Sequence, residues 1–178
     1  MEPTPIEPPQ NPAGEFQPET NLTDDRRAEL IREIEQAPRR LEQAVAGLFD
    51  DQFDAKYRNW TIRQIVHHLA DSHVHSYIRF KWALTEETPL IKAYDENLWA
   101  ELPDALRGDD IASLTLYAGI HQAWSQLLRL MTAKQFARSF KHPETGKTVS
   151  LDDALCYYAW HARHHTAQIV WIRDQRRW

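Results

Sequence analysis

Apolar residues recur at spacings of three and four along four long stretches of the chain, a pattern that predicts amphipathic helices. The first stretch covers residues 24–48, and Thr23 or Asp24 can cap it. Pro38 lies inside this stretch, where it has no N–H to donate and its ring clashes with the carbonyl group four residues earlier. We therefore expect this helix to be kinked or divided near its middle.

The second helix has a clear predicted start, because Thr61 and Gln64 have the spacing of a capping box. Its apolar positions continue to about Leu84. Residues 85–108 contain two prolines and a glycine, and they predict a long connection with a short helix near 96–102. A connection of this length allows the chain to cross between distant helices.

Two more helices are separated by a short segment of turn-forming residues. The third helix follows a pair of aspartates and ends near Thr132. Residues 140–149 include a proline and a Thr-Gly pair, which indicate a turn or small hairpin. Ser150 and Asp153 have capping-box spacing and begin the last helix, which continues to near the C-terminus. Four long helices in one domain imply an all-α fold, a four-helix bundle.

The N-terminal segment differs in composition, since six of the ten prolines lie in the first 18 residues. A regular helix is excluded there, so we divide the chain into an extended proline-rich arm, residues 1–20, and a helical domain, residues 21–178. Either a disordered tail or an arm packed on the domain fits this composition. Ile6 and Phe16 are the large apolar side chains that could anchor a packed arm.

Composition and charge exclude several classes of function. The 178 residues carry a net charge of -5, which gives no electrostatic reason to expect nucleic acid or an anionic membrane as a partner. A single cysteine, Cys156, excludes an internal disulfide and a thiolate cage for a metal ion. The first residues have no signal-peptide pattern, and no apolar run approaches the ~20 residues of a membrane span. We expect a cytoplasmic protein.

Histidines are concentrated on two of the predicted helices. Seven of the nine lie on the second and fourth helices, at positions 67, 68, 73, 75, 161, 164 and 165. On the fourth helix, a rotation of about 100° per residue places His165 roughly 30°, His161 roughly 70° and His164 about 130° from the centre of the apolar stripe. His161 and His165 therefore face inward on successive turns, where both imidazoles can bind one metal ion.

A site with two histidines would be weak, so the second helix must supply a third ligand. His73 lies near the centre of the apolar stripe of this helix, and His68 lies to one side of it. Apolar residues on the far side indicate that this helix is buried from more than one direction, so the pattern leaves both histidines open. Asp71 and His121 stay open as additional ligands.

Three segments of the sequence resemble the YfiT-like branch of the DinB superfamily. They are WTIRQIVHHLADSHVHSYIRFK at residues 60–81, HPETGKTVSLDDAL at 142–155 and YYAWHARHH at 157–165. The likeness extends from the PIEPPQNPAGEFQPE arm to the last helix. The resemblance implies a four-helix bundle with up-down-down-up topology, a homodimer, and a divalent metal ion held by three histidines.

The resemblance also assigns the metal ligands by position. The family's first ligand is the histidine directly before Leu-Ala-Asp, which is His68 here, and the other two fall on His161 and His165. On this basis we expect His68 rather than His73 to bind the metal. His73 then becomes a candidate for supporting a ligand through a hydrogen bond.

An enzyme acting on a small-molecule substrate is the function that the resemblance implies. Three neutral histidines leave a divalent ion, zinc first and nickel as an alternative, with an open position for a nucleophile. If the nucleophile is water, the protein is a metal-dependent hydrolase. If it is a low-molecular-weight thiol such as bacillithiol, the protein is an S-transferase. A non-catalytic metal-binding module is the competing interpretation.

Overall fold

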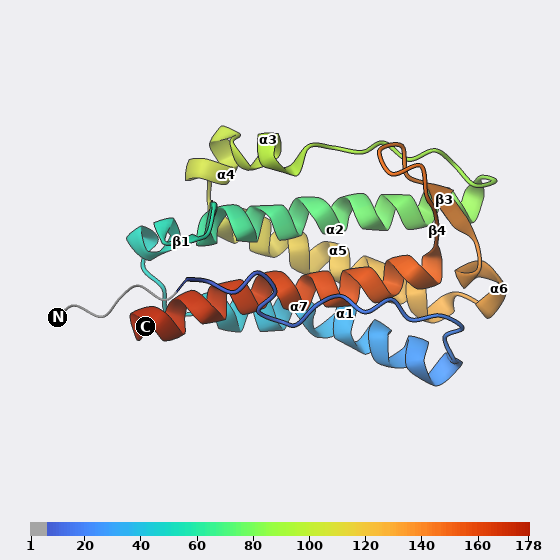
Figure 1. The fold of residues 1–178 in the computed structure, drawn as a ribbon, viewed down its shortest axis with the longest axis horizontal. Coiled ribbons are helices and arrows are strands. Elements are labelled where there is room, and N and C mark those ends of the chain that lie inside the picture. The colour runs from blue at the N-terminus through green and yellow to red at the C-terminus, as the bar shows by residue number, and fades with distance from the viewer. Residues whose placement is uncertain (1–6) are drawn as a thin grey trace.

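A bundle of four long helices forms the body of the protein in the computed structural model, which describes residues 7–178 (Figure 1). The first six residues of the predicted arm, including Ile6, lie outside the described residues. The long helices are α1 (Asp24–Val45), α2 (Ile62–Thr85), α5 (Asp110–Leu130) and α7 (Leu151–Arg176). Within the described part of the chain, no helix is long and apolar enough to cross a membrane.

The topology of the bundle is up-down-down-up, as expected. In Figure 1, α1 and α7 run in one direction and α2 and α5 run in the opposite one. Because α2 and α5 are parallel, the chain must return along the whole bundle between them, and the predicted long connection does this. It contains two short helices, α3 (Glu96–Ala100) and α4 (Pro103–Arg107), in place of the single one predicted. Pro103 begins the second of these, since proline is favoured at the first helical position.

Helix starts follow the predicted capping signals. Thr61 and Gln64 form a reciprocal capping box at α2, and Ser150 and Asp153 form one at α7. The hydroxyl of Thr23 accepts a hydrogen bond from the backbone of the first turn of α1. Helix α1 ends at Val45, three residues before the predicted end at residue 48. Gly47, two residues later, adopts a φ of 77°, a left-handed conformation that does not continue a helix.

Short elements connect the long helices. The predicted hairpin at residues 140–149 is confirmed as an antiparallel pair in which Phe140 faces Val149. A second short hairpin and two further helical turns were not predicted. The short elements are η1 (Asp50–Asp54), β1 (Lys56–Tyr57), β2 (Trp60–Thr61), α6 (Ala133–Phe136), β3 (Ser139–Lys141) and β4 (Thr148–Ser150).

Pro38 does not divide the first helix. The structure has one continuous α1 that includes Pro38, so of the two expected alternatives the division is excluded, and a kink stays a prediction. Packing of α1 against α5 and α7 keeps the helix continuous, with apolar residues buried on both sides of the proline. The carbonyl group that loses its helical partner to Pro38 is that of Ile34, and it finds another donor in the core.

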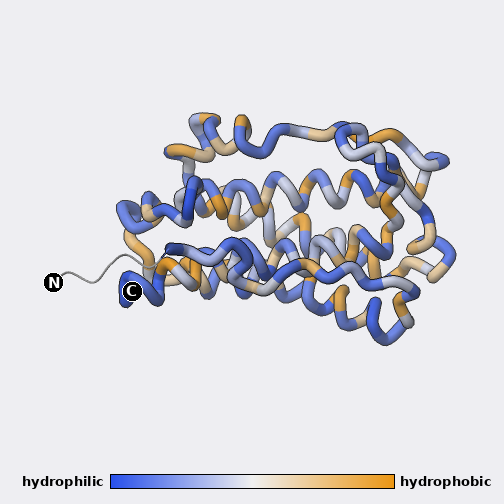
Figure 2. Tube along the Cα trace, viewed as in Figure 1, coloured by the Kyte–Doolittle hydropathy of each residue, from blue (hydrophilic) through white to orange (hydrophobic). Residues whose placement is uncertain are grey.

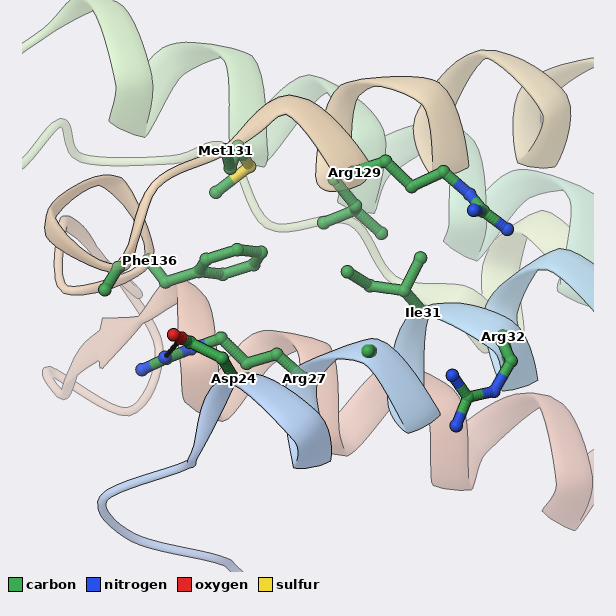
Figure 3. Close-up of a pocket in the computed structure, with 10 residues that line it drawn as sticks. Asp24, Arg27, Ile31, Arg32, Arg129, Met131 and Phe136 are labelled. Carbon is green, nitrogen blue, oxygen red and sulfur yellow. Dashed lines mark hydrogen bonds and ion pairs between the residues drawn. The ribbon is translucent and has the colours of Figure 1, made fainter.

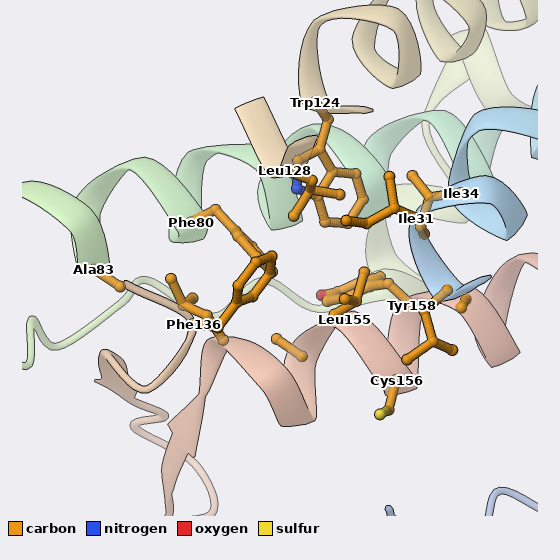
Figure 4. Close-up of a cluster of buried hydrophobic side chains, with 14 of the residues drawn as sticks. Ile31, Ile34, Phe80, Ala83, Trp124, Leu128, Phe136, Leu155, Cys156 and Tyr158 are labelled. Carbon is orange, nitrogen blue, oxygen red and sulfur yellow. The ribbon is translucent and has the colours of Figure 1, made fainter. Parts of the chain in front are cut away.

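The core of the bundle consists of two hydrophobic clusters with a polar layer between them. Along the long helices, hydrophobic and hydrophilic positions alternate within each turn (Figure 2). The first cluster lies where α1 and α7 begin and includes Leu30, Ile34, Phe80, Trp124, Leu128, Phe136 and Leu155 (Figure 4). The second lies toward the other end and includes Leu41, Ile62, Ile65, Leu69, Tyr117, Ile169 and Ile172. Buried histidines stand at the boundary on three helices: His73, His121 and His161.

Replacing Phe80 by alanine should lower the free energy of unfolding by about 3–5 kcal/mol, because it removes a fully buried ring and leaves a cavity. Denaturant unfolding followed by circular dichroism measures this loss. The matched control is Leu130→Ala, since Leu130 is 83% exposed and its replacement should cost less than about 0.5 kcal/mol. Equal losses in the two variants would contradict the assignment of the core.

Candidate metal centre

Three histidines from two neighbouring helices converge at one point of the bundle. His68 comes from α2, and His161 and His165 come from successive turns of α7. One ring nitrogen of each lies within 4.8 Å of the other two, and the Nε2 atoms of His68 and His161 are 3.2 Å apart. The structure therefore brings together the three residues that were predicted as ligands.

The orientation of His165 is set by a neighbouring amide. Nδ1 of His165 lies 2.9 Å from Oε1 of Gln168. An amide oxygen only accepts hydrogen bonds, so Nδ1 carries the proton and Nε2 is left with a lone pair. The amide nitrogen of Gln168 donates to Nε2 of His164 at 3.0 Å. His164 lies outside the three-histidine cluster, but it is buried, at 8% exposed, which its predicted position away from the apolar stripe did not indicate.

Behind His161, two further histidines form a chain of hydrogen bonds. Nδ1 of His161 lies 3.2 Å from Nε2 of His73, and Nδ1 of His73 lies 2.9 Å from Nε2 of His121. The chain ends at the backbone of α1, where Nδ1 of His121 lies 2.5 Å from the carbonyl oxygen of Ile34. The chain therefore links α1, α5 and α2 to the predicted ligand on α7.

Burial keeps these three imidazoles neutral. Desolvation lowers the pKa of His121 to about 4 and lowers the pKa values of His73 and His161 well below the ordinary value. Each ring then carries one proton near neutral pH, so each can donate one hydrogen bond and accept one. A charged ring in this layer would lack a counter-ion as well as solvent.

The carbonyl group at the end of the chain fixes every tautomer in it. A carbonyl oxygen only accepts, so His121 must donate from Nδ1 and accept at Nε2. His73 must then donate from Nδ1 to His121 and accept at Nε2. It follows that His161 donates from Nδ1, and its Nε2 presents a lone pair toward His68.

Pro38 is the reason that this carbonyl group is available. In a regular helix the carbonyl of Ile34 would accept from the N–H of residue 38, but proline has none. Buried carbonyl groups need a partner, and His121 supplies it. The sequence did contain a signal, because a proline inside a helix always frees the carbonyl four residues earlier. The donor on another helix could not be identified from the sequence.

The cluster suits a divalent metal ion. Two nitrogens that each lie 2.0–2.1 Å from a tetrahedral ion are about 3.3 Å apart, close to the 3.2 Å between His68 and His161. His161 and His165 both hold their protons on Nδ1, leaving Nε2 for coordination. In addition, a ligand imidazole normally donates its other N–H to a fixed acceptor, as both rings do here.

The other candidate residues have different surroundings. His73 and His121 lie in the hydrogen-bonded chain behind His161 and outside the cluster. His73 contacts a predicted ligand through a hydrogen bond, which is the supporting position expected for it from the sequence. The carboxyl group of Asp71 also lies outside the cluster, and burial together with the nearby Asp104 raises its pKa to about 6. Nδ1 of His67 contacts the hydroxyl of Ser113, 3.0 Å away.

A cavity of about 780 Å³ opens beside the three histidines. Its walls come from α2, α7, the connection at residues 93–96, the β3–β4 hairpin and the N-terminal arm. The arm is packed on the domain here, the second of the two alternatives left open by its composition. The ring of Phe16 contacts Tyr157 and Trp160, and the indole of Trp160 donates to the carbonyl oxygen of Gly14 at 2.9 Å.

Comparison with known proteins points to one family. The sequence profile of the DinB superfamily matches residues 33–169. The chain is 45% identical to "Putative metal-dependent hydrolase YfiT" of Bacillus subtilis, covering 94% of this chain and 95% of that protein. A relative with the same description from Oceanobacillus iheyensis is 45% identical over 94% of this chain and 97% of its own.

A solved structure shows the same fold. The structure of YfiT from Bacillus subtilis, described as a probable metal-dependent hydrolase with an unusual four-helix bundle topology, matches with a TM-score of 0.92. The sequences are 45% identical, and the match covers 94% of this chain and 97% of that one. The likeness therefore extends over nearly the whole of both chains, beyond the four long helices alone.

Replacing His161 or His165 by alanine should abolish stoichiometric metal binding, because each change removes one of three converging donors. Elemental analysis of protein purified without a polyhistidine tag measures the metal content. His164→Ala is the matched control on the same helix and should retain the metal, since its ring contacts Gln168. Equal metal content in the three variants would show that the cluster is not the metal site.

Replacing His73 by phenylalanine should weaken metal binding about 10–100-fold, because Nδ1 of His161 loses its acceptor. Competition with a chromophoric chelator measures the affinity. His67→Phe is the control, since His67 is also buried on α2 but has no contact with this chain of histidines. If both variants bound the metal equally well, the proposed orienting effect of His73 would be wrong.

Proposed function

The chain belongs to the DinB superfamily, and on this basis we propose that it is a metal-dependent hydrolase of a small-molecule substrate, with the ion held by His68, His161 and His165. The observation that carries the proposal is the convergence of three imidazoles on one wall of a cavity, where desolvation lowers the pKa of each and keeps it neutral. Zinc is the expected ion and nickel the alternative, because imidazole nitrogen binds both.

A neutral donor set is suited to activating a nucleophile. His68, His161 and His165 would hold a divalent ion through three neutral nitrogens, and such an ion would supply the Lewis acidity that activates a nucleophile near neutral pH. Among the described residues, no carboxylate or thiolate joins the cluster to neutralise the ion. The open cavity beside the histidines supports a catalytic site, because a purely structural site is closed by four protein ligands.

Aromatic residues shape the space around the three histidines. The ring of Trp60 lies 4.6 Å from that of His68 and is stacked at 6.2 Å from that of His165. These contacts restrict the two imidazoles and exclude water from one side of the cluster. Tyr157 lines the same cavity, with its ring 5.6 Å from that of His161.

Tyr157 is suited to donate a hydrogen bond to the substrate. The residue is 40% exposed, and desolvation of its hydroxyl by the surrounding protein raises the pKa to about 12, so the group stays protonated near neutral pH. It therefore serves as a donor rather than a base. A donor beside the reacting carbonyl or phosphoryl oxygen would stabilise the negative charge that develops there during hydrolysis.

The metal-loaded protein should cleave activated esters or amides from a broad panel, without added thiol. Chelation should remove the activity, added zinc should restore it, and His161→Ala should lower it at least about 100-fold, since the nucleophile would no longer be activated. Stopped assays of product release measure this. His164→Ala, which leaves the cluster intact, should retain most of the activity.

The same assay separates the proposal from its alternatives. Each reaction is repeated with monochlorobimane as an electrophile, with and without a low-molecular-weight thiol such as bacillithiol. Conjugation that depends on both the metal and the thiol, without ester or amide cleavage, would identify an S-transferase instead. No reaction of either kind across the panel would favour a non-catalytic metal-binding module.

A further inference from the structure

A buried arginine lines the cavity beside the three histidines. Arg79 lies on α2, and its side chain is within the cavity wall while the residue is only 8% exposed. It follows His68 by eleven residues, which places it about 16 Å further along the helix and only about 20° around it. The two residues therefore lie on the same face of α2, at different distances along one cavity.

The guanidinium group of Arg79 has few partners. Its Nη1 donates to the hydroxyl oxygen of Tyr158 at 2.9 Å, and this is its one hydrogen bond to the described residues. Nε is buried and has no hydrogen-bond partner there. The edge formed by Nε and Nη2 is the edge that binds a carboxylate or phosphate through two parallel hydrogen bonds, and it is unused.

Most other buried or partly buried arginines of the described chain are paired with carboxylates, and Arg173 instead donates to three backbone carbonyl groups. Arg63, which is 6% exposed, contacts Asp50 at 2.8 Å and Asp110 at 2.5 Å. Arg27 lines a separate cavity between α1, α5 and α6 (Figure 3). It forms ion pairs with Asp24 and Asp152. No such pair is formed by Arg79 within the described residues.

The carboxylates that share the cavity do not neutralise Arg79. Glu19 binds Arg26 through both oxygens, and Asp153 accepts from the hydroxyl of Ser150 in the capping box of α7. The other two, Glu96 and Glu144, form no ion pair with Arg79 in the part of the chain that the structure describes, where Tyr158 is its hydrogen-bond partner. A guanidinium group is always charged, and a charge buried without a partner is destabilising, so an anion from outside the chain would supply what is missing.

A second unpaired polar atom lies in the same cavity. Nδ1 of His142, on the β3–β4 hairpin, is buried without a hydrogen-bond partner among the described residues. The walls of the cavity also include Tyr94, Tyr157 and Trp160. The cavity therefore combines a cationic side chain, several aromatic rings and the imidazole nitrogens of the three histidines.

We propose that Arg79 binds an oxyanion group of the substrate, so that the substrate is a small molecule with a carboxylate or phosphate at the end opposite the reacting bond. The location of the reacting end rests on the proposed hydrolase function. Binding of the anion itself requires only Arg79 and its surroundings. His142 is placed to make a further hydrogen bond to a polar group next to the anion.

The proposal can be tested by binding measurements on the full-length protein, both metal-free and loaded with zinc. The probes are 4-phenylbutanoate, phenyl phosphate and the neutral 4-phenylbutanamide. At least one of the two anions should shift the ¹⁵N resonance of Arg79 Nε and bind at least about tenfold more tightly than the amide, in the metal-free protein too. The preferred anion identifies the group as carboxylate or phosphate.

The matched variants are Arg79→Met and Arg129→Met. Arg79→Met should lose the preference for the anion while keeping the melting temperature of the wild type or exceeding it, because it removes an unpaired buried charge. Arg129 lies outside the cavity and pairs with Glu35 on the surface, so Arg129→Met should bind the anion normally.

Three outcomes would overturn the proposal: equal binding of anions and amide, unchanged anion binding in Arg79→Met, or no shift of the Arg79 resonance at millimolar anion. An anion bound only to the metal would lose its affinity on metal removal and keep it in Arg79→Met. Because anion binding is measured without metal and without turnover, its failure is distinguishable from a failure of the hydrolase proposal.

Discussion

Three buried imidazoles in the middle of the bundle must stay neutral, and the polar nitrogens of each must have hydrogen-bond partners. This requirement determines the arrangement of the residues around them. His121, His73 and His161 form one directional chain of hydrogen bonds that starts at a backbone carbonyl group. That carbonyl belongs to Ile34 and is available because Pro38 has no N–H. A proline that weakens one helix therefore fixes the protonated nitrogen of a side chain on another. Loss of any member would leave a buried polar group without a partner.

The polar layer divides the hydrophobic core, and it also positions the cluster. Packing on both sides holds the rings of the chain in place, so Nε2 of His161 faces Nε2 of His68 with its lone pair exposed to the cavity wall. Gln168 has the same effect on His165 from the solvent side. The bundle thus prepares a set of donors before any ion binds, which lowers the reorganisation needed on binding. The up-down-down-up topology matters here because it makes α2 and α7 neighbours and leaves the crossover and the arm to close the cavity.

Much of this architecture could be predicted from local patterns. Helical periodicity located the four long helices, capping boxes located two of their starts, and the i, i+4 spacing identified His161 and His165 as inward-facing. The choice between His68 and His73 could not be made in this way, because α2 is buried on several sides and a single stripe does not describe it. The role of Pro38 and the unpaired state of Arg79 depend on contacts between distant segments. Local patterns carry no information about such contacts.

The tautomeric state of the buried histidines is the decisive measurement for this chain of hydrogen bonds. Long-range ¹H–¹⁵N correlation spectra of metal-free protein, labelled with ¹⁵N in its histidines and recorded near neutral pH, distinguish a protonated Nδ1 from a protonated Nε2 in each ring. The hydrogen bonds of these rings predict neutral imidazoles with the proton on Nδ1 in His121, His73, His161 and His165. A proton on Nε2 of His161, or a charged ring in the chain, would contradict this prediction, because the nitrogen that faces His68 would then have no lone pair to offer.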